Sequence, residues 1–193
     1  MSVVSLLSGG LDSCLMAQLI KESGVNQIAF FVNYGQLNYE REYNSARLHA
    51  NKIGIAVPNK LDISGYGNLI TSGLTTSEKH IVDDAFLPGR NLLLLLSASS
   101  FAIQNGCDTV AMGLLREDTA IFPDQTDDFL ISAENTINKC LGKRIKILTP
   151  LREFYKKDVV TLAKKKGIQT YYSCHKGDET PCGKCISCKE FVY

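Results

Sequence analysis

A short polar turn near the start of the chain carries the residue types that bind an anion. It reads Ser8-Gly9-Gly10-Leu11-Asp12-Ser13. Its glycines allow backbone amides to close around a phosphate, and a helix beginning there would direct its positive end at the same point. The Ser8 and Ser13 hydroxyls add donors, and Asp12 could orient a phosphate-bound metal. The turn is neither a Walker loop nor a Gly-x-Gly-x-x-Gly site, which leaves another phosphate loop or an ordinary capped turn.

Four of the seven cysteines lie close together near the end of the chain. Their spacing is Cys174-x7-Cys182-x2-Cys185-x2-Cys188. In a reducing compartment such a cluster indicates metal binding rather than cross-linking. Four thiolates suit tetrahedral zinc and leave no open coordination position, so the spacing predicts a structural site. A redox Cys-x-x-Cys pair and an iron–sulfur cluster are alternatives that the spacing leaves open.

Two cationic residues are placed where they could meet a phosphate. Arg90 stands at the expected start of an apolar helix and could hold a phosphate or carboxylate through two hydrogen bonds. Its alternative role is that of a surface arginine beside a helix cap. Lys156 stands at the start of another expected helix, where the helix dipole disfavours a cation unless an anion is present. A phosphate contact is therefore the favoured role for Lys156.

The apolar pattern indicates elements that bring these residues together. It predicts strands at residues 3–7, 28–32, 60–63, 109–112 and 145–148. It predicts helices at residues 12–23, 39–53, 91–104, 127–141 and 155–166. This alternation is typical of an α/β fold with a parallel sheet between helices, which binds ligands at the carboxyl ends of its strands. Residues 64–87 lack the pattern and are expected to form a lid, a substrate loop or a partly helical segment.

The composition limits the class of protein. The 193 residues carry 21 basic and 20 acidic side chains, a net charge of +1, which argues against bulk binding to duplex nucleic acid or an anionic membrane. The longest aliphatic run, residues 92–96, is far shorter than the roughly 20 residues that cross a bilayer. With no visible signal peptide, we expect a cytoplasmic protein of one domain, residues 1–170, carrying a small zinc-binding segment, residues 171–193.

The turn at residues 8–13 resembles the SGGxDS loop of the N-type ATP pyrophosphatases, or PP-loop enzymes, which cleave ATP between its α and β phosphates. Further motifs follow in order: Asn33-Tyr34-Gly35-Gln36, Leu87-Pro88-Gly89-Arg90-Asn91, Gly113 with Glu117-Asp118, Phe122-Pro123-Asp124, Thr149-Pro150-Leu151 with Lys156, and the cysteine cluster. From Val3 to Cys188 this set resembles the QueC family, the 7-cyano-7-deazaguanine synthases of queuosine-precursor biosynthesis.

The resemblance implies a Rossmann-like PP-loop fold that uses ATP, Mg²⁺ and Zn²⁺. It implies adenylation of 7-carboxy-7-deazaguanine, attack by ammonia and conversion to the nitrile, with AMP and pyrophosphate released. Catalytic roles would fall to Asp12, Arg90 and Lys156. The implied nucleotide-binding residues are Leu7, Ser8, Gly9, Gly10, Leu11, Asp12, Ser13, Tyr34, Gly35, Gln36, Gly89, Arg90, Asn91 and Gly113. The implied substrate residues are Asp118, Phe122, Pro123 and Asp124, and the implied zinc ligands are Cys174, Cys182, Cys185 and Cys188.

Two departures from the family pattern are visible, one in the turn at residues 8–13 and one in the expected substrate segment. Leu11 stands where members usually carry Gln, and residues 121–125 read Ile-Phe-Pro-Asp-Gln instead of Gly-Tyr-Pro-Asp-Cys. The expected partners are a small carboxylate and ammonia, with a protein or other amine as an alternative acceptor and a homodimer also open. A tRNA-modifying PP-loop enzyme and a non-catalytic zinc module on an α/β scaffold are the remaining alternatives.

Overall fold

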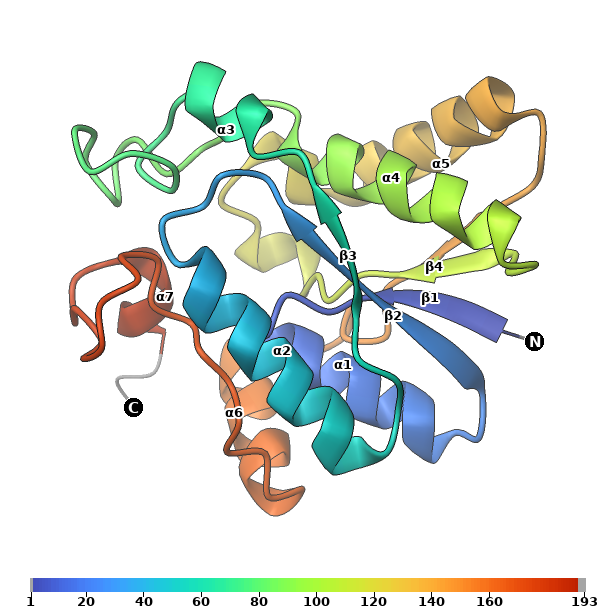
Figure 1. The fold of residues 1–193 in the computed structure, drawn as a ribbon, viewed down its shortest axis with the longest axis horizontal. Coiled ribbons are helices and arrows are strands. Elements are labelled where there is room, and N and C mark those ends of the chain that lie inside the picture. The colour runs from blue at the N-terminus through green and yellow to red at the C-terminus, as the bar shows by residue number, and fades with distance from the viewer. Residues whose placement is uncertain (1, 191–193) are drawn as a thin grey trace.

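Short apolar strands and amphipathic helices alternate along the chain and build one parallel sheet between two helical layers (Figure 1). The structure, a computed structural model, describes residues 2–190. The sheet has the order β3-β2-β1-β4-β5, and every neighbouring pair is parallel. The strands are β1 Ser2–Leu6, β2 Asn26–Asn33, β3 Asn59–Asp62, β4 Thr109–Ala111 and β5 Lys146–Leu148. The predicted α/β class is confirmed.

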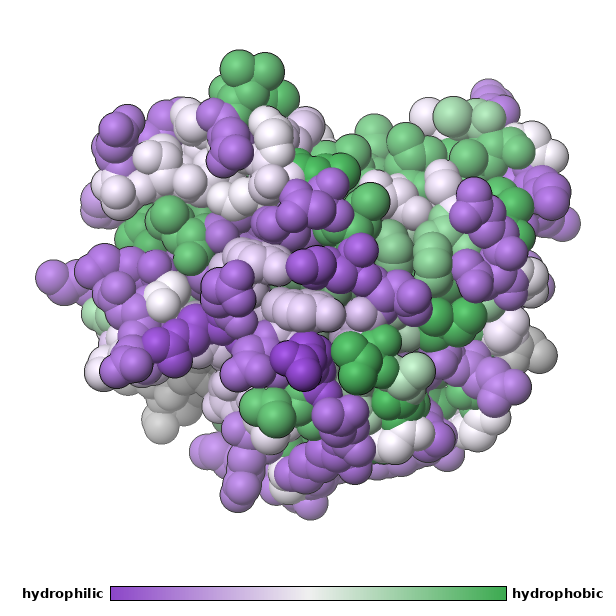
Figure 2. Space-filling view, viewed as in Figure 1, coloured by the Kyte–Doolittle hydropathy of each residue, from purple (hydrophilic) through white to green (hydrophobic). Residues whose placement is uncertain are grey.

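The two helical layers cover opposite faces of the sheet. One layer contains α1 Leu11–Glu22, α2 Tyr39–Ile53 and α6 Lys156–Lys165, and the other contains α4 Arg90–Gln104 and α5 Asp127–Leu141. Apolar residues are exposed on the second layer, including Ile131, which is 63% exposed, and apolar side chains gather over α4 and α5 in Figure 2. Among residues 2–190, no helix combines the length and the apolar character that a membrane span requires.

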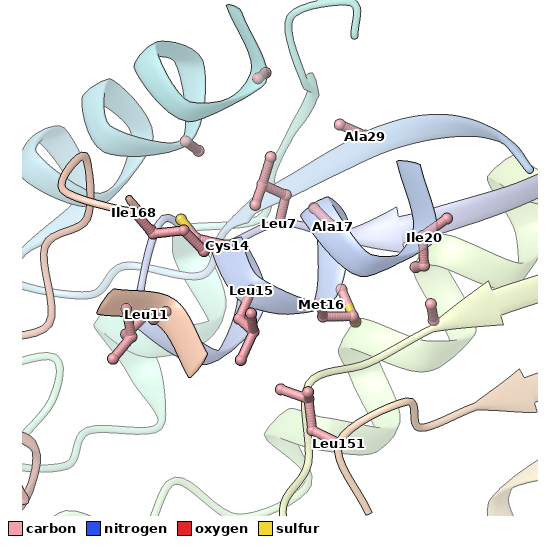
Figure 3. Packing of buried hydrophobic residues seen from close by; sticks show 14 of the residues in the cluster. Leu7, Leu11, Cys14, Leu15, Met16, Ala17, Ile20, Ala29, Leu151 and Ile168 are labelled. Carbon is pink, nitrogen blue, oxygen red and sulfur yellow. The ribbon is translucent and has the colours of Figure 1, made fainter. Parts of the chain in front are cut away.

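Alternation along the strands fills both halves of the core. In and just after β1, Val3 and Leu7 pack into the layer of α1, while Val4 and Leu6 pack into the layer of α4. This follows from the two-residue period of a strand, which directs successive side chains to opposite faces. Figure 3 shows the first cluster, in which α1 contributes Leu11, Cys14, Leu15, Met16, Ala17 and Ile20. The packing fixes the start of α1, and with it the turn that precedes this helix.

The segment between β3 and α4 is ordered without much regular structure. It contains the short helix α3 Gly65–Leu69, which agrees with the partly helical segment expected there, although the bounds of this helix were not predicted. The amide of Gly73 then donates to the carbonyl of Asp84, and the hydroxyl of Tyr66 donates to the carbonyl of Pro88. The segment is therefore folded back on itself beside the start of α4. The sequence pattern did not predict three further short helices, which are η1 Glu117–Thr119, η2 Pro123–Gln125 and α7 Ile186–Lys189.

Candidate active site

The polar turn at residues 8–13 lies between β1 and α1, at the carboxyl edge of the sheet. Its serines hold its shape. Ser13 Oγ accepts from the amide of Gly9 at 3.1 Å and from Ser8 Oγ at 3.0 Å, and it donates to the carbonyl of Gly10 at 2.9 Å. Because the first amides of α1 have no partners within the helix, this positive end of α1 favours an anion.

Gly9 is required by both its backbone conformation and its surroundings. Its φ is +86°, and a Cβ placed there would lie 2.1 Å from the carbonyl oxygen of Glu42. We therefore expect Gly9→Ala to lower the free energy of unfolding by more than about 2 kcal/mol, because left-handed strain and a backbone clash add. The matched control is Gly24→Ala. Gly24 has φ +76° with nothing within 4 Å of the same position, so only the strain of about 1–2 kcal/mol applies. Urea unfolding of both variants measures the difference, and equal losses would contradict it.

A cavity of about 310 Å³ opens above this turn. The predicted site residues that line it are Leu7, Ser8, Gly10, Leu11, Asp12, Ser13, Tyr34, Gln36, Arg90, Asn91, Gly113, Phe122 and Lys156. Predicted residues outside its lining are Gly9, Gly35, Gly89, Asp118, Pro123 and Asp124. The fold thus brings the turn, Arg90 and Lys156 to one cavity from three separate parts of the chain.

Lys156 is the first residue of α6 and lines the cavity. It contacts the turn at residues 8–13, which we call the phosphate turn, through Asp12. Its Nζ lies 2.8 Å from each carboxylate oxygen of Asp12 and 2.9 Å from Oε2 of Glu190. Burial disfavours the ammonium, but the two carboxylates outweigh burial and raise the pKa of Lys156. A charged Lys156 therefore stands at the anion end of the cavity. Glu190, which no sequence motif pointed to, completes this contact.

Arg90 occupies another wall, beside the end of β2. Its guanidinium lies 5.8 Å from the centre of the Tyr34 ring, and its Nε donates to Oδ1 of Asn91 at 3.3 Å. Asn91 is in turn held by Asp124, whose backbone carbonyl accepts from Asn91 Nδ2 at 2.9 Å. Asp124 is only 7% exposed. The structure therefore gives Asp124 a positioning contact beneath the wall rather than a place on it.

Asp118 has a different environment from the other predicted substrate residues. Its carboxylate accepts from Arg116 Nε at 3.1 Å and from the hydroxyl of Tyr155 at 3.3 Å. The hydrogen bond from Arg116 lowers the pKa of Asp118. This surface contact lies outside the cavity lining, whereas Phe122 of the same loop lies within it.

Glu42 is a cavity residue that the sequence analysis did not select. It lies in the first turn of α2 and accepts from Gln36 Nε2 at 3.2 Å. Burial raises the pKa of Glu42 to about 7 against the opposing effect of that hydrogen bond. Its place shortly after the Tyr34-Gly35-Gln36 motif is the signal that could have identified it.

The four clustered cysteines form a compact set of donors. Their Sγ atoms all lie within 4.8 Å of one another, and those of Cys182 and Cys188 are 4.0 Å apart. Four sulfurs at the Zn–S distance of about 2.3 Å would be roughly 3.8 Å apart in a tetrahedron, so the set fits a tetrahedral metal. The amides of Cys185 and Cys188 donate to neighbouring sulfurs. These thiolates are the residues that would hold a metal.

The cysteine segment, described at residues 171–190, is hydrogen-bonded to the phosphate turn. The amide of Tyr172 donates to the carbonyl of Gly9 at 2.9 Å, and Ser173 Oγ accepts from the amide of Leu11 at 3.4 Å. Asn38 Nδ2 donates to the carbonyl of Cys174 at 3.1 Å. Cavity-lining residues from this segment are Ser173, His175, Ile186, Ser187 and Glu190. The segment therefore builds part of the cavity wall, a role that the spacing of its cysteines did not predict.

Comparison with known proteins assigns the chain to a family. Residues 2–191 match the family model described as "Queuosine biosynthesis protein QueC". A 7-cyano-7-deazaguanine synthase from a Nitratiruptor species is 31% identical over 98% of this chain and 91% of that protein. The enzyme of the same name from Methanosarcina mazei is 28% identical over 97% of this chain and 90% of that protein.

Solved structures support the fold. The U34-tRNA thiolase NcsA from Methanococcus maripaludis, solved with its [4Fe-4S] cluster, has a TM-score of 0.58 at 21% identity over 92% of this chain and 60% of that one. The NMN synthetase from Francisella tularensis has a TM-score of 0.58 at 18% identity over 92% of this chain and 68% of that one. At these identities the likeness concerns the PP-loop fold alone. Because the family model spans nearly all of the sequence, the chain belongs to the QueC family of queuosine biosynthesis proteins.

Proposed function

We propose that the chain is an AMP-forming ligase that converts 7-carboxy-7-deazaguanine and ammonia into 7-cyano-7-deazaguanine at the expense of ATP. The proposal rests on one observation: the phosphate turn, Arg90 and Lys156 line the same cavity. The shared name of the curated relatives supports the choice of substrate and product.

The first step activates the carboxylate, which is otherwise a poor acyl donor. A carboxylate oxygen of the substrate attacks the α-phosphorus of ATP, the bond to the β-phosphate oxygen breaks, and pyrophosphate leaves with that electron pair. The turn amides and Lys156 stabilise the departing phosphates, and Arg90 stabilises the charge that develops at the cavity wall. Mg²⁺ bound to the phosphates would supply further charge neutralisation, and Asp12, which lines the cavity, would hold it.

The later steps use the acyl adenylate. Ammonia attacks its carbonyl carbon, AMP leaves, and one proton is released to give the amide. Attack by the amide oxygen on a second ATP again releases pyrophosphate. Loss of AMP and of the two protons that remain on the nitrogen then gives the nitrile. The chain's contribution throughout is to hold the reacting atoms in place and to limit access of water.

We also propose zinc as the metal of the cysteine segment, with a structural role. Four thiolates fill a tetrahedral shell and leave no position for a substrate, which suits zinc in such a role. Elemental analysis of protein purified without chelators should find zinc, and protein containing iron and labile sulfide in its place would contradict the assignment.

A separate experiment identifies the amine that accepts the acyl group. Incubation with ATP, Mg²⁺, 7-carboxy-7-deazaguanine and ammonium, followed by mass spectrometry, should show the nitrile. A protein amine is the second candidate acceptor, because residues 121–125 depart from the family pattern and Ile121, Phe122 and Gln125 among them line the cavity. Gln125 Oε1 accepts from the amides of Ile121 and Phe122 and so holds this segment in place. AMP release with product appearing only after a protein acceptor is added would overturn the synthase assignment in favour of conjugation.

A further inference from the structure

Among residues 2–190, three carboxylates line the cavity, and Glu42 stands apart from Asp12 and Glu190, which both pair with Lys156. Glu42 lines the cavity together with Gln36 and Tyr34, and the charge of Arg90 on another wall acts on its carboxylate. Gln36 Nε2 donates to Glu42 Oε2 at 3.2 Å and to the carbonyl of Val32 at 3.3 Å, so the glutamine fixes the direction of the carboxylate. Burial raises the pKa of Glu42 to about 7 and outweighs the opposing effects of hydrogen bonds from Gln36 and Asn38 and of the Arg90 charge.

The position of Glu42 relative to the phosphate turn limits what it can bind. The main chain of Glu42 packs against Gly9, while Lys156 supplies a cation to the turn from α6. A phosphate is attracted to the turn amides and Lys156 and repelled by a carboxylate. The part of a ligand that meets Glu42 should therefore carry N–H donors, and preferably two of them, since a carboxylate accepts paired donors strongly.

We propose that Glu42 is the specificity residue for the heterocycle, its carboxylate accepting the ring N1–H and the 2-amino group of a guanine-type base. This inference rests on the proposed function, because the proposed substrate carries this pair of donors on one edge. The adenine of ATP has no such pair. Aromatic side chains flank the same cavity: the ring of Phe122 lies 5.2 Å from that of Phe86, and Tyr34 lies on the Arg90 wall. They offer flat apolar surfaces to a bicyclic base.

The test compares two carboxylates that differ by one amino group. They are 7-carboxy-7-deazaguanine and the corresponding deazahypoxanthine, which lacks the 2-amino group. With saturating ATP, wild-type protein should form AMP with a kcat/KM more than about 10-fold higher for the guanine compound. Glu42→Gln should lower kcat/KM for that compound by about 10²-fold, because its amide NH₂ faces a donor, and should lose most of the discrimination. The KM for ATP should be unchanged.

Glu40→Gln is the matched control. Glu40 lies two residues away on the same helix, is exposed and does not line the cavity. It should keep wild-type discrimination. Should Glu42→Gln not fold, Glu42→Asp serves in its place, since a shortened carboxylate loses the same contacts, and thermal melting identifies the variants that fold.

Three results would overturn the inference. Wild-type protein that uses both carboxylates equally would show that the 2-amino group is not recognised. A raised KM for ATP in Glu42→Gln would place Glu42 on the nucleotide instead. An equal fall in kcat for both carboxylates with each KM unchanged would indicate proton transfer.

Direct binding separates this inference from the proposed function. If wild-type protein forms no AMP with either carboxylate, the proposed function fails. Calorimetry then decides the inference by itself: wild-type protein should bind the guanine compound more than about 10-fold tighter than its analogue, and Glu42→Gln should not. Equal binding, or no binding, of the two compounds to wild-type protein would refute it.

Discussion

Replacing Lys156 by alanine should lower the rate of AMP formation by about 10²-fold or more, because the ammonium then no longer neutralises charge on the phosphates. The geometry behind this expectation is the placement of Nζ 2.8 Å from Asp12, inside the cavity and at the phosphate turn. The loss should appear in kcat/KM for ATP under conditions in which the carboxylate is saturating.

Lys157→Ala is the control for this prediction. Lys157 is the next residue of α6, is exposed, and lies over the ring of Tyr155 outside the cavity. It should retain AMP formation to within about twofold of wild type. Melting curves of both variants show whether they are folded. A folded Lys156→Ala protein with the wild-type rate would show that Lys156 serves structure alone and that the phosphates bind elsewhere.

Removing the metal from the cysteine segment should damage both stability and ATP binding. When the free zinc concentration is about 1,000 times Kd, binding raises the free energy of unfolding by about 4.1 kcal/mol. For a chain of this length, that corresponds to a change in Tm of roughly 8–16 °C. Because Tyr172 and Ser173 bind the phosphate turn and Glu190 contacts Lys156, the KM for ATP should rise as well.

Cys185→Ser tests this coupling at a buried ligand, and Cys140→Ser is its control. Cys140 is exposed and free, and it lies on α5, away from the cluster. The Cys185 variant should lose bound metal, melt earlier and show a raised KM for ATP at a temperature where it remains folded, whereas the Cys140 variant should match wild type. Loss of metal with an unchanged KM for ATP would mean that the segment only stabilises the chain.

Much of the fold was predictable because its signals are local. The two-residue alternation of Val3, Val4, Leu6 and Leu7 between the two core clusters is the pattern of a strand buried on both faces. The helix after the phosphate turn could likewise be read from its apolar spacing. For α3 only a partly helical segment could be expected. The bounds of this helix could not be predicted, because Gly65–Leu69 contains two glycines and no apolar period, and tertiary contacts such as the bond from Tyr66 to Pro88 help to hold it.

The site was predictable where the residues form contiguous motifs and not where they meet only through folding. The phosphate turn, Arg90 and Lys156 carry motif or charge signals, and the structure brings them to one cavity. Glu190 belongs to no recognisable motif. Its contact with Lys156 depends on how the cysteine segment folds back onto the turn. Asp124 belongs to a recognisable motif and was predicted to bind substrate, but it lies outside the cavity lining. Its contact with Asn91 follows from how η2 packs against α4, which the motif does not reveal.

We propose that the cavity adenylates a carboxylate carried by a deazaguanine. Exchange of labelled pyrophosphate into ATP, measured with Mg²⁺ and no amine, reports this reaction alone, because exchange requires reversible formation of the adenylate. We expect exchange that depends on 7-carboxy-7-deazaguanine and that is lost in Lys156→Ala. Exchange that is absent with this carboxylate, or that proceeds equally without it, would show that the cavity does not adenylate this substrate.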